Sequence, residues 1–220
     1  MNCLLDIFKL TDKLMDYLEK KGFAFSPEGY PVFSREMFLS EIPDLIVPVH
    51  QRKNRRVVNK KKTVISFFCG DVDIYRRLEK LLDEMDEYKE YMGVVGADVT
   101  ITKDMDLEWQ RAIILLNQLV TAVFASSGIK IVLNTRMGVR KTKDMFRYIP
   151  RGIMIASGFR GGERKCLKYD FEYLSKVLSF LPSKLLIYGR CQKPVLEHLD
   201  KLGVEYVLYQ DFRDFCREVA

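Results

Sequence analysis

The 220-residue sequence lacks the long apolar runs, paired cysteines and histidine clusters that mark several common protein classes. No apolar run approaches the roughly 18 to 20 residues needed to cross a bilayer. The first eighteen residues also lack the basic start and uniform apolar core of a signal peptide. We therefore expect a cytoplasmic protein without a membrane partner.

The five cysteines are scattered along the chain and form no CxxC pair. The two histidines, His50 and His198, stand near no cysteine in the sequence. A disulfide framework, a zinc ribbon and a Ser/His or Cys/His hydrolase are therefore not supported. The leading interpretation includes no metal and no cofactor.

What the sequence does have is a repeated unit: a short apolar run, a small or polar turn, and an amphipathic helical pattern. The runs cover residues 63–69, 92–97, 130–133, 153–156, 184–188 and 204–209. Near-continuous apolar runs are typical of strands buried on both faces, as in a parallel sheet covered by helices. The pattern predicts an α/β fold with a mostly parallel sheet of about six strands and flanking helices. Both an open doubly wound sheet and an incomplete barrel fit it.

Three segments differ in character along the chain. Residues 1–50 are expected to form an N-terminal helical and loop extension, because a helix-spaced pattern ends near Gly22 and prolines interrupt the residues after it. Residues 51–62 are expected to be an exposed basic connector, and residues 63–220 the α/β domain. The extension should pack at one edge or end of the sheet.

The connector carries seven cations and no acidic residue. They are Arg52, Lys53, Arg55, Arg56, Lys60, Lys61 and Lys62. Such a run attracts phosphate or an acidic partner, and it is also typical of a solvated linker. The net charge of +6 is modest for a nucleic-acid-binding protein, so the distribution of charge says more than the total.

Polar residues follow the predicted strands, where ligands of parallel sheets collect. They are Asp71, Asp98, Asn134, Arg136, Ser157, Arg160 and Arg190, all expected on one rim. Asp71 and Asp98 are candidate metal ligands or an acid–base pair. Asp also caps helices, which is the expected role of Asp73 and Asp104. The arginines, together with the connector, predict one positive surface for nucleic acid.

Over residues 65–210 the chain resembles a bacterial, phage and mobile-element family known as domain of unknown function 4417. The matching residues are Phe67-Phe68 before Asp71, Gly96-Ala97-Asp98-Val99-Thr100, Asp104-Met105, Gln110, Gly128 to Asn134, Phe146, Ile149-Pro150-Arg151-Gly152, Ala156-Ser157-Gly158 and Leu186-Ile187-Tyr188-Gly189. The chain departs from the family at Met137-Gly138, where Trp-Gly is common, and at Ile114 and Leu116, where Asn and Arg are common. The resemblance implies a mobile-element context and no particular activity.

Three functions fit these features. The leading hypothesis is a phage- or mobile-element-encoded protein that binds an anionic partner, with nucleic acid (DNA or RNA) as the first choice. The first alternative is a protein-binding inhibitor of a host defence or replication factor, which would dock through aromatic residues of the extension. These aromatics are Phe23, Phe25, Tyr30, Phe33 and Phe38, which would otherwise form a lid over the sheet. The second alternative is a metal-dependent enzyme acting on a phosphate-containing substrate; the oligomeric state is left open.

Overall fold

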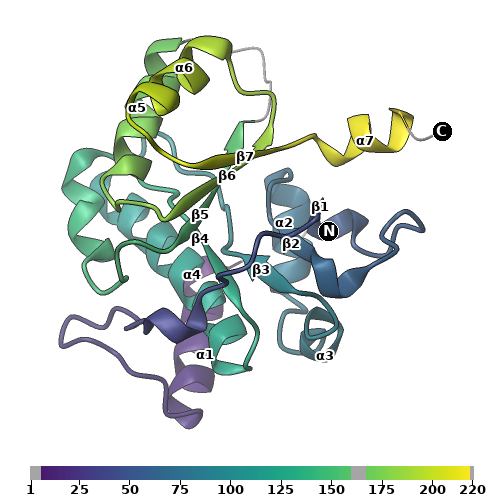
Figure 1. Cartoon of the computed structure of the whole chain (residues 1–220). Coiled ribbons are helices and arrows are strands. Elements are labelled where there is room, and N and C mark those ends of the chain that lie inside the picture. Colours follow the sequence, from purple (N-terminus) through teal and green to yellow (C-terminus); the bar gives the residue numbers. More distant parts are fainter. Residues whose placement is uncertain (1–5, 160–166, 219–220) are drawn as a thin grey trace.

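The computed structural model describes residues 6–159 and 167–218, and seven strands form its sheet (Figure 1). The strands are β1 (Leu45–Pro48), β2 (Thr63–Ser66), β3 (Gly93–Val95), β4 (Ile131–Asn134), β5 (Met154–Phe159), β6 (Lys184–Gly189) and β7 (Tyr206–Tyr209). Each strand pairs in parallel with the one before it in the chain. The predicted α/β fold with a parallel sheet and flanking helices is confirmed.

The described residues form seven α-helices, of which α2 to α6 lie in crossovers between strands, α1 precedes β1 and α7 follows β7. They are α1 (Ile7–Lys20), α2 (Asp71–Leu78), α3 (Met85–Tyr88), α4 (Leu107–Ser126), α5 (Leu167–Leu178), α6 (Lys193–Lys201) and α7 (Phe212–Glu218). The 3-10 turns are η1 (Arg35–Met37), η2 (Val49–Gln51), η3 (Lys60–Lys62) and η4 (Arg140–Phe146). Because the strand order never reverses, right-handed crossovers place the helices on one face of the sheet. None of the helices in the described part of the chain is long and apolar enough to span a bilayer.

The sheet curls into a nearly closed barrel with a packed interior. One buried apolar cluster takes side chains from all seven strands, and a second cluster lies between the sheet and the helices. Inside the barrel the rings of Phe68, after β2, and Tyr188, on β6, stack with centroids 5.6 Å apart. In a flat sheet, four strand spacings would separate these positions by about 19 Å. A Cβ atom on Gly158 would lie 2.8 Å from the Phe68 ring, so glycine makes room for this stack.

The barrel is left open along one seam, between β7 and β1. Among the described strands no ladder joins these two edges. Instead, the hydroxyl of Tyr209 on β7 donates a hydrogen bond to the carbonyl of Pro43, which precedes β1, at 2.6 Å. Burial raises the pKa of Tyr209 to about 12, so this donor keeps its proton over the physiological range. Helix α7 packs beside β1 and covers the same seam.

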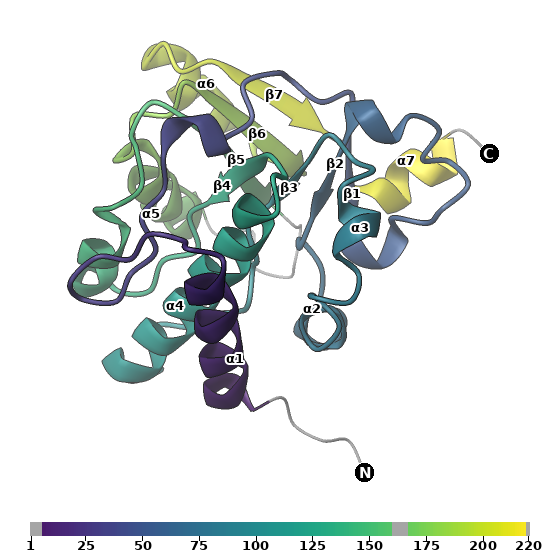
Figure 2. The same ribbon diagram turned by 90° about the horizontal axis from the view of Figure 1, so that it is seen from below.

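The N-terminal extension covers one side and the amino end of the barrel. Helix α1 packs on α4, and the two helices lie side by side in Figure 2. In the segment that leads to β1, Leu39 donates its N–H to the carbonyl of Ile131 and joins the interior cluster. Phe33 and Phe38 are buried against the sheet, so they form part of a lid and offer no docking surface.

Two features of the elements differ from the sequence-based expectations. Strand β1 lies in the segment that the sequence assigns to the extension. The sequence does not reveal it because the strand has only four residues and the last of them is Pro48. The helix caps also differ: Gly70 occupies the N-cap position of α2, where Asp73 was expected to cap. At the start of α4, Asp106 rather than Asp104 accepts a hydrogen bond from the N–H of Trp109.

Candidate ligand site at the carboxyl-end face

The predicted rim residues lie at one end of the barrel. Asp71 begins α2 after β2, Asp98 follows β3, Asn134 ends β4, Ser157 lies near the end of β5, and Arg190 follows β6. This common location follows from the shared direction of the strands. Arg160 lies outside the described residues.

Asp98 is held by polar side chains of the neighbouring strand. The Nδ2 of Asn134 donates to Asp98 Oδ1 at 2.9 Å and to the carbonyl of Ala97 at 3.0 Å. The Nε of Arg136 lies 3.7 Å from Asp98 Oδ1. The carboxylate therefore fixes the stem of the arginine, whose side chain is 33% exposed and reaches solvent.

The residues after Asp98 are fixed by two further side chains. The Asn117 Oδ1 on α4 accepts a hydrogen bond from the N–H of Val99 at 3.1 Å. Asp71 Oδ1 accepts hydrogen bonds from the N–H and the hydroxyl of Thr100 at 3.2 and 3.0 Å. Asp71 thus anchors the loop that carries Asp98. Within the described residues, no group of three or more His, Cys, Asp and Glu side chains could hold a metal ion.

Unsatisfied polar atoms gather near the ends of β4 and β5. Asn134 Oδ1, Thr135 Oγ1, Arg136 Nε and Ser157 Oγ are buried without a hydrogen-bond partner among the described residues. Thr135 and Ser157 are fully buried. Nearly all buried polar groups in proteins have partners, and each one left without a partner costs about 1–3 kcal/mol. Each of these atoms is enclosed, so only a group as small as a water molecule could become its partner.

A small cavity lies beneath this end, between α4 and the sheet. It is lined by Asn117, Gln118, Thr121, Asn134 and Arg136, with apolar side chains including Phe33, Phe38 and Phe146. Its volume of about 10 Å³ admits a single water-sized group. Any larger ligand must therefore bind on the solvent side, at the guanidinium end of Arg136.

The loop that carries Arg136 is itself held by a buried glutamine. Gln110 Oε1 accepts a hydrogen bond from the N–H of Val139 at 2.7 Å, and its Nε2 donates to the carbonyl of Met105 at 2.7 Å. A Cβ atom on Gly138 would lie 2.0 Å from Gln110 Oε1. Only glycine fits beside this side chain, so Gly138 and Gln110 together set the path of the loop.

Arg52 does not belong to an exposed surface, contrary to the sequence-based expectation. It is 2% exposed, and its guanidinium lies 2.9 Å from Glu84 and 2.8 Å from Glu87. The guanidinium also lies over the ring of Tyr88, 5.6 Å from its centroid. The carboxylates pack against the connector from residues beside and within α3, so Arg52 serves as a buried anchor and is not available to a phosphate.

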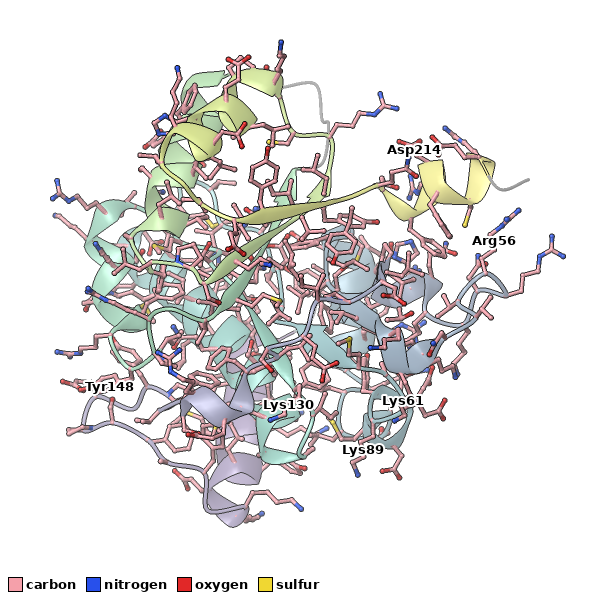
Figure 3. All side chains as sticks on the ribbon, viewed as in Figure 1. Arg56, Lys61, Lys89, Lys130, Tyr148 and Asp214 are labelled. Atoms are coloured by element: carbon pink, nitrogen blue, oxygen red, sulfur yellow. The ribbon has the colours of Figure 1, made fainter. Side chains whose placement is uncertain are left out.

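Most other cations of the connector have acidic or carbonyl partners. Lys53 pairs with Glu87 at 3.0 Å, Lys60 with Glu90 at 2.5 Å and Lys62 with Glu41 at 3.7 Å, while Lys61 Nζ donates to the carbonyl of Lys89. Figure 3 shows Lys61 beside Lys89, and Arg56 farther along, on the side of α7. Burial of the Glu87 carboxyl would raise its pKa, but hydrogen bonds from Arg52 and Lys53 outweigh burial and lower it.

The last cations of the connector, Lys60–Lys62, do not lie on the rim with Arg136 and Arg190. The connector is the crossover from the carboxyl end of β1 to the amino end of β2, so Lys60–Lys62 directly precede β2. Arg136 and Arg190 lie at the opposite end of the barrel. Arg190 is 82% exposed and lies 3.2 Å from Asp214 of α7. The cations are therefore divided between the two ends.

The same rim contains a histidine that the sequence did not single out. His50 follows β1, and its Nδ1 lies 4.0 Å from Asp73 Oδ2 in the first turn of α2. Its side chain is 17% exposed. The signal that could reveal β1 in the sequence is the apolar run Leu45–Val47. The prolines on either side of this run obscure it. Without that strand, nothing placed His50 at the carboxyl-end face.

No family model, curated protein or solved structure matches this chain. The resemblance to domain of unknown function 4417 therefore stays a prediction. Function is inferred instead from the geometry of the carboxyl-end face.

Proposed function

We propose that the protein binds a phosphate-bearing ligand at the carboxyl-end face of its barrel, with Arg136 as the principal cation. The observation that carries this proposal is the Arg136 side chain, which is 33% exposed at the carboxyl-end face while its Nε lies 3.7 Å from Asp98 Oδ1. Barrels of parallel strands bind their ligands at this end, where loops after several strands meet. The enzyme that the sequence analysis gave as an alternative would also take a phosphate-containing ligand.

The side-chain chemistry favours phosphate over an apolar ligand. Guanidinium groups bind phosphate oxygens through planar, charge-assisted hydrogen bonds. Asp98 fixes the Nε end of Arg136. The outer nitrogens are therefore left as the part of the side chain that can meet an anion.

Titration with inorganic phosphate and pyrophosphate tests this function. The wild type should show saturable binding by nuclear magnetic resonance or calorimetry, and Arg136→Ala should weaken it at least tenfold, because a hydrogen bond to a charged group contributes about 1.5–3 kcal/mol. Arg151→Ala is the matched control: this arginine is exposed and precedes β5 at the amino end. Absence of saturable binding, or equal losses in the two variants, would contradict the proposal.

A second candidate function is nucleic-acid binding by the connector. It is favoured because buried residues anchor this segment while several of its other side chains are exposed. Arg52 and Val57 are buried and anchor it, while Arg55, Val58 and Lys61 are exposed. A basic loop held in one conformation binds a phosphate backbone with less loss of conformational entropy than a mobile loop. That the protein comes from a phage or mobile element is still inferred only from the family resemblance.

DNA and RNA binding across a salt series would test the connector. Replacing Arg55 and Lys61 with Ala should reduce the slope of log affinity against log salt by up to about two, since each lost phosphate contact contributes about 0.9. Lys13 and Lys20, two exposed lysines of α1, form the control pair. Equal slopes for the two double variants, or no binding to either nucleic acid at low salt, would exclude the connector.

The protein-inhibitor alternative loses part of its predicted docking surface. Phe33 and Phe38 are buried, and Phe23, Phe25 and Tyr30 pack partly against the outer core. Interface hot spots need aromatics that are accessible before the partner binds. We therefore do not propose docking through these residues.

A further inference from the structure

A second basic segment follows Arg136 along the chain and includes the 3-10 turn η4. Arg140, Lys141 and Lys143 are exposed, and no acidic side chain pairs with any of them among the described residues. The one acid of residues 136–147 is Asp144, and both of its carboxylate oxygens accept hydrogen bonds from Arg111 of α4 at 2.9 Å. This segment therefore keeps its positive charge, whereas most cations of the connector have acidic or carbonyl partners.

The geometry of η4 arranges two of these cations in a row. A 3-10 helix has three residues per turn and rises about 2 Å per residue, so side chains three positions apart lie above one another, about 6 Å apart. Arg140 and Lys143 share the exposed row of η4, while Thr142 and Met145 share the buried one. Successive phosphates of an extended nucleic-acid strand stand at a similar spacing. The row therefore matches a chain of phosphates better than one isolated phosphate.

The row continues directly from the Arg136 site. Arg136 lies two residues beyond the end of β4, and Arg140 begins η4 four positions later. Gln110 fixes the path between them, because its Oε1 accepts a hydrogen bond from the N–H of Val139 at 2.7 Å. Thr142 closes the first turn of η4 through its N–H and its hydroxyl, which donate to the carbonyl of Val139 at 2.9 and 2.8 Å. A cationic surface held in this way binds an anion with little loss of conformational entropy.

The surroundings of η4 favour a nucleic-acid strand over a membrane surface. Basic segments that bind membranes also carry exposed apolar side chains that enter the lipid. None of the large apolar side chains that are exposed in the described chain belongs to residues 136–147. The same residues contain no α-helix or β-ribbon that could enter a groove of a duplex, so a single strand is the better fit.

The connector is a different surface from η4. Figure 3 shows Tyr148, just past η4, and Lys61 of the connector on opposite sides of the view. One short stretch of a strand cannot lie along both segments at once, so the two can be tested separately.

We propose that the phosphate-bearing ligand is a single strand of nucleic acid, with one phosphate at Arg136 and its neighbours along Arg140 and Lys143. Proteins that bind single strands without sequence preference use cations that track the phosphate backbone. DNA and RNA share this backbone charge, so both are used as probes. The inference rests on the proposed function of Arg136, and it is the alternative to strand binding by the connector.

Fluorescence anisotropy with labelled oligo(dT) and oligo(U) of about 20 nucleotides, a length above the usual site size, tests the proposal across a salt series. The wild type should bind at least one of them saturably, and duplex DNA more weakly. Arg140→Gln combined with Lys143→Gln should weaken strand binding at least tenfold at low salt. The slope of log affinity against log salt should fall by about 1.4, since each phosphate contact of a single strand contributes about 0.7. Inorganic phosphate should bind this variant within about twofold of wild type, because exposed charges are screened by salt.

Arg55→Gln combined with Lys61→Gln is the matched control. It removes one exposed arginine and one exposed lysine from the connector, so the net charge changes equally. This control should keep strand affinity within about threefold of wild type, whereas strand binding by the connector predicts the reverse order. An equal or larger loss in the control would overturn the assignment to η4.

The remaining outcomes separate this inference from the proposed function. If phosphate binds and Arg136→Ala weakens it, but neither oligonucleotide binds or the η4 variant binds them like wild type, the strand inference fails and the phosphate site stands. The strand inference also fails if duplex DNA, or polyglutamate of matched charge, binds as tightly as the single strands. If phosphate does not bind and Arg136→Ala leaves strand affinity unchanged, the proposed function fails and the strand inference fails with it. Thermal unfolding of the η4 variant shows that any loss occurs in folded protein.

Discussion

Replacing Arg52 with alanine is expected to lower the free energy of unfolding by about 3 kcal/mol, which is large for a single cation in a basic loop. The guanidinium is buried between Glu84, Glu87 and the ring of Tyr88. Its removal leaves two largely buried carboxylates without their principal counter-ion and opens space beside the tyrosine. Unfolding by urea, followed by circular dichroism, measures the change.

Arg55→Ala provides the control for this variant. Arg55 stands three residues later in the same connector but is exposed, so its replacement should change stability by no more than about 0.5 kcal/mol. Arg52→Met should also lower the free energy of unfolding. Adding Glu84→Gln and Glu87→Gln to Arg52→Met should recover part of that loss, because neutral side chains need no counter-ion. If the two single alanine variants proved equally stable, Arg52 would have no anchoring role.

The second large effect is expected inside the barrel. Phe68→Ala should cost about 3–5 kcal/mol, since it removes a buried ring and leaves a cavity. In a double-mutant cycle with Tyr188→Leu, the two positions should couple by about 0.5–1.5 kcal/mol, as stacked aromatic pairs do. Phe68 follows β2 and Tyr188 belongs to β6, and these strands meet only because the sheet curls.

The coupling therefore measures the curvature of the sheet in solution. The matched comparison is Phe68→Ala with Phe146→Ala, because Phe146 is buried in the outer cluster, where it contacts Phe180. That pair should be additive within about 0.5 kcal/mol. Additivity at Phe68 and Tyr188 as well would show that the two rings do not meet, and would argue for an open sheet.

Much of the fold follows from the sequence because its units are local. Each predicted apolar run forms a strand, since a strand buried on both faces shows up as a continuous apolar segment. Strand β1 escapes this pattern because it has only four residues and the last of them is Pro48. The choice between open sheet and barrel depends on which strands meet across the interior, and no local pattern encodes that contact.

For the candidate site too, the sequence predicts what depends on local pattern and misses what depends on distant contacts. The sequence places Asp71, Asp98, Asn134 and Ser157 on one rim, because strand direction alone determines their end of the sheet. It does not show that Asp71 binds Thr100, because the two residues are separated by 29 positions. The partners of the connector lie similarly far away, at Glu84 and Glu87, so a run with no acid in its own sequence becomes largely neutralised in the fold.

The open seam of the barrel has a consequence for the order of assembly during synthesis. Each strand pairs with the strand made just before it, so the sheet can grow from β1 to β7 as the chain emerges. The hydrogen bond from Tyr209 to Pro43 spans 166 positions and cannot form until the last strand exists. Contacts of such separation form after the local ones. The nascent chain therefore exposes the β1 edge throughout its synthesis, and the prolines at 43 and 48 protect that edge from pairing with other chains.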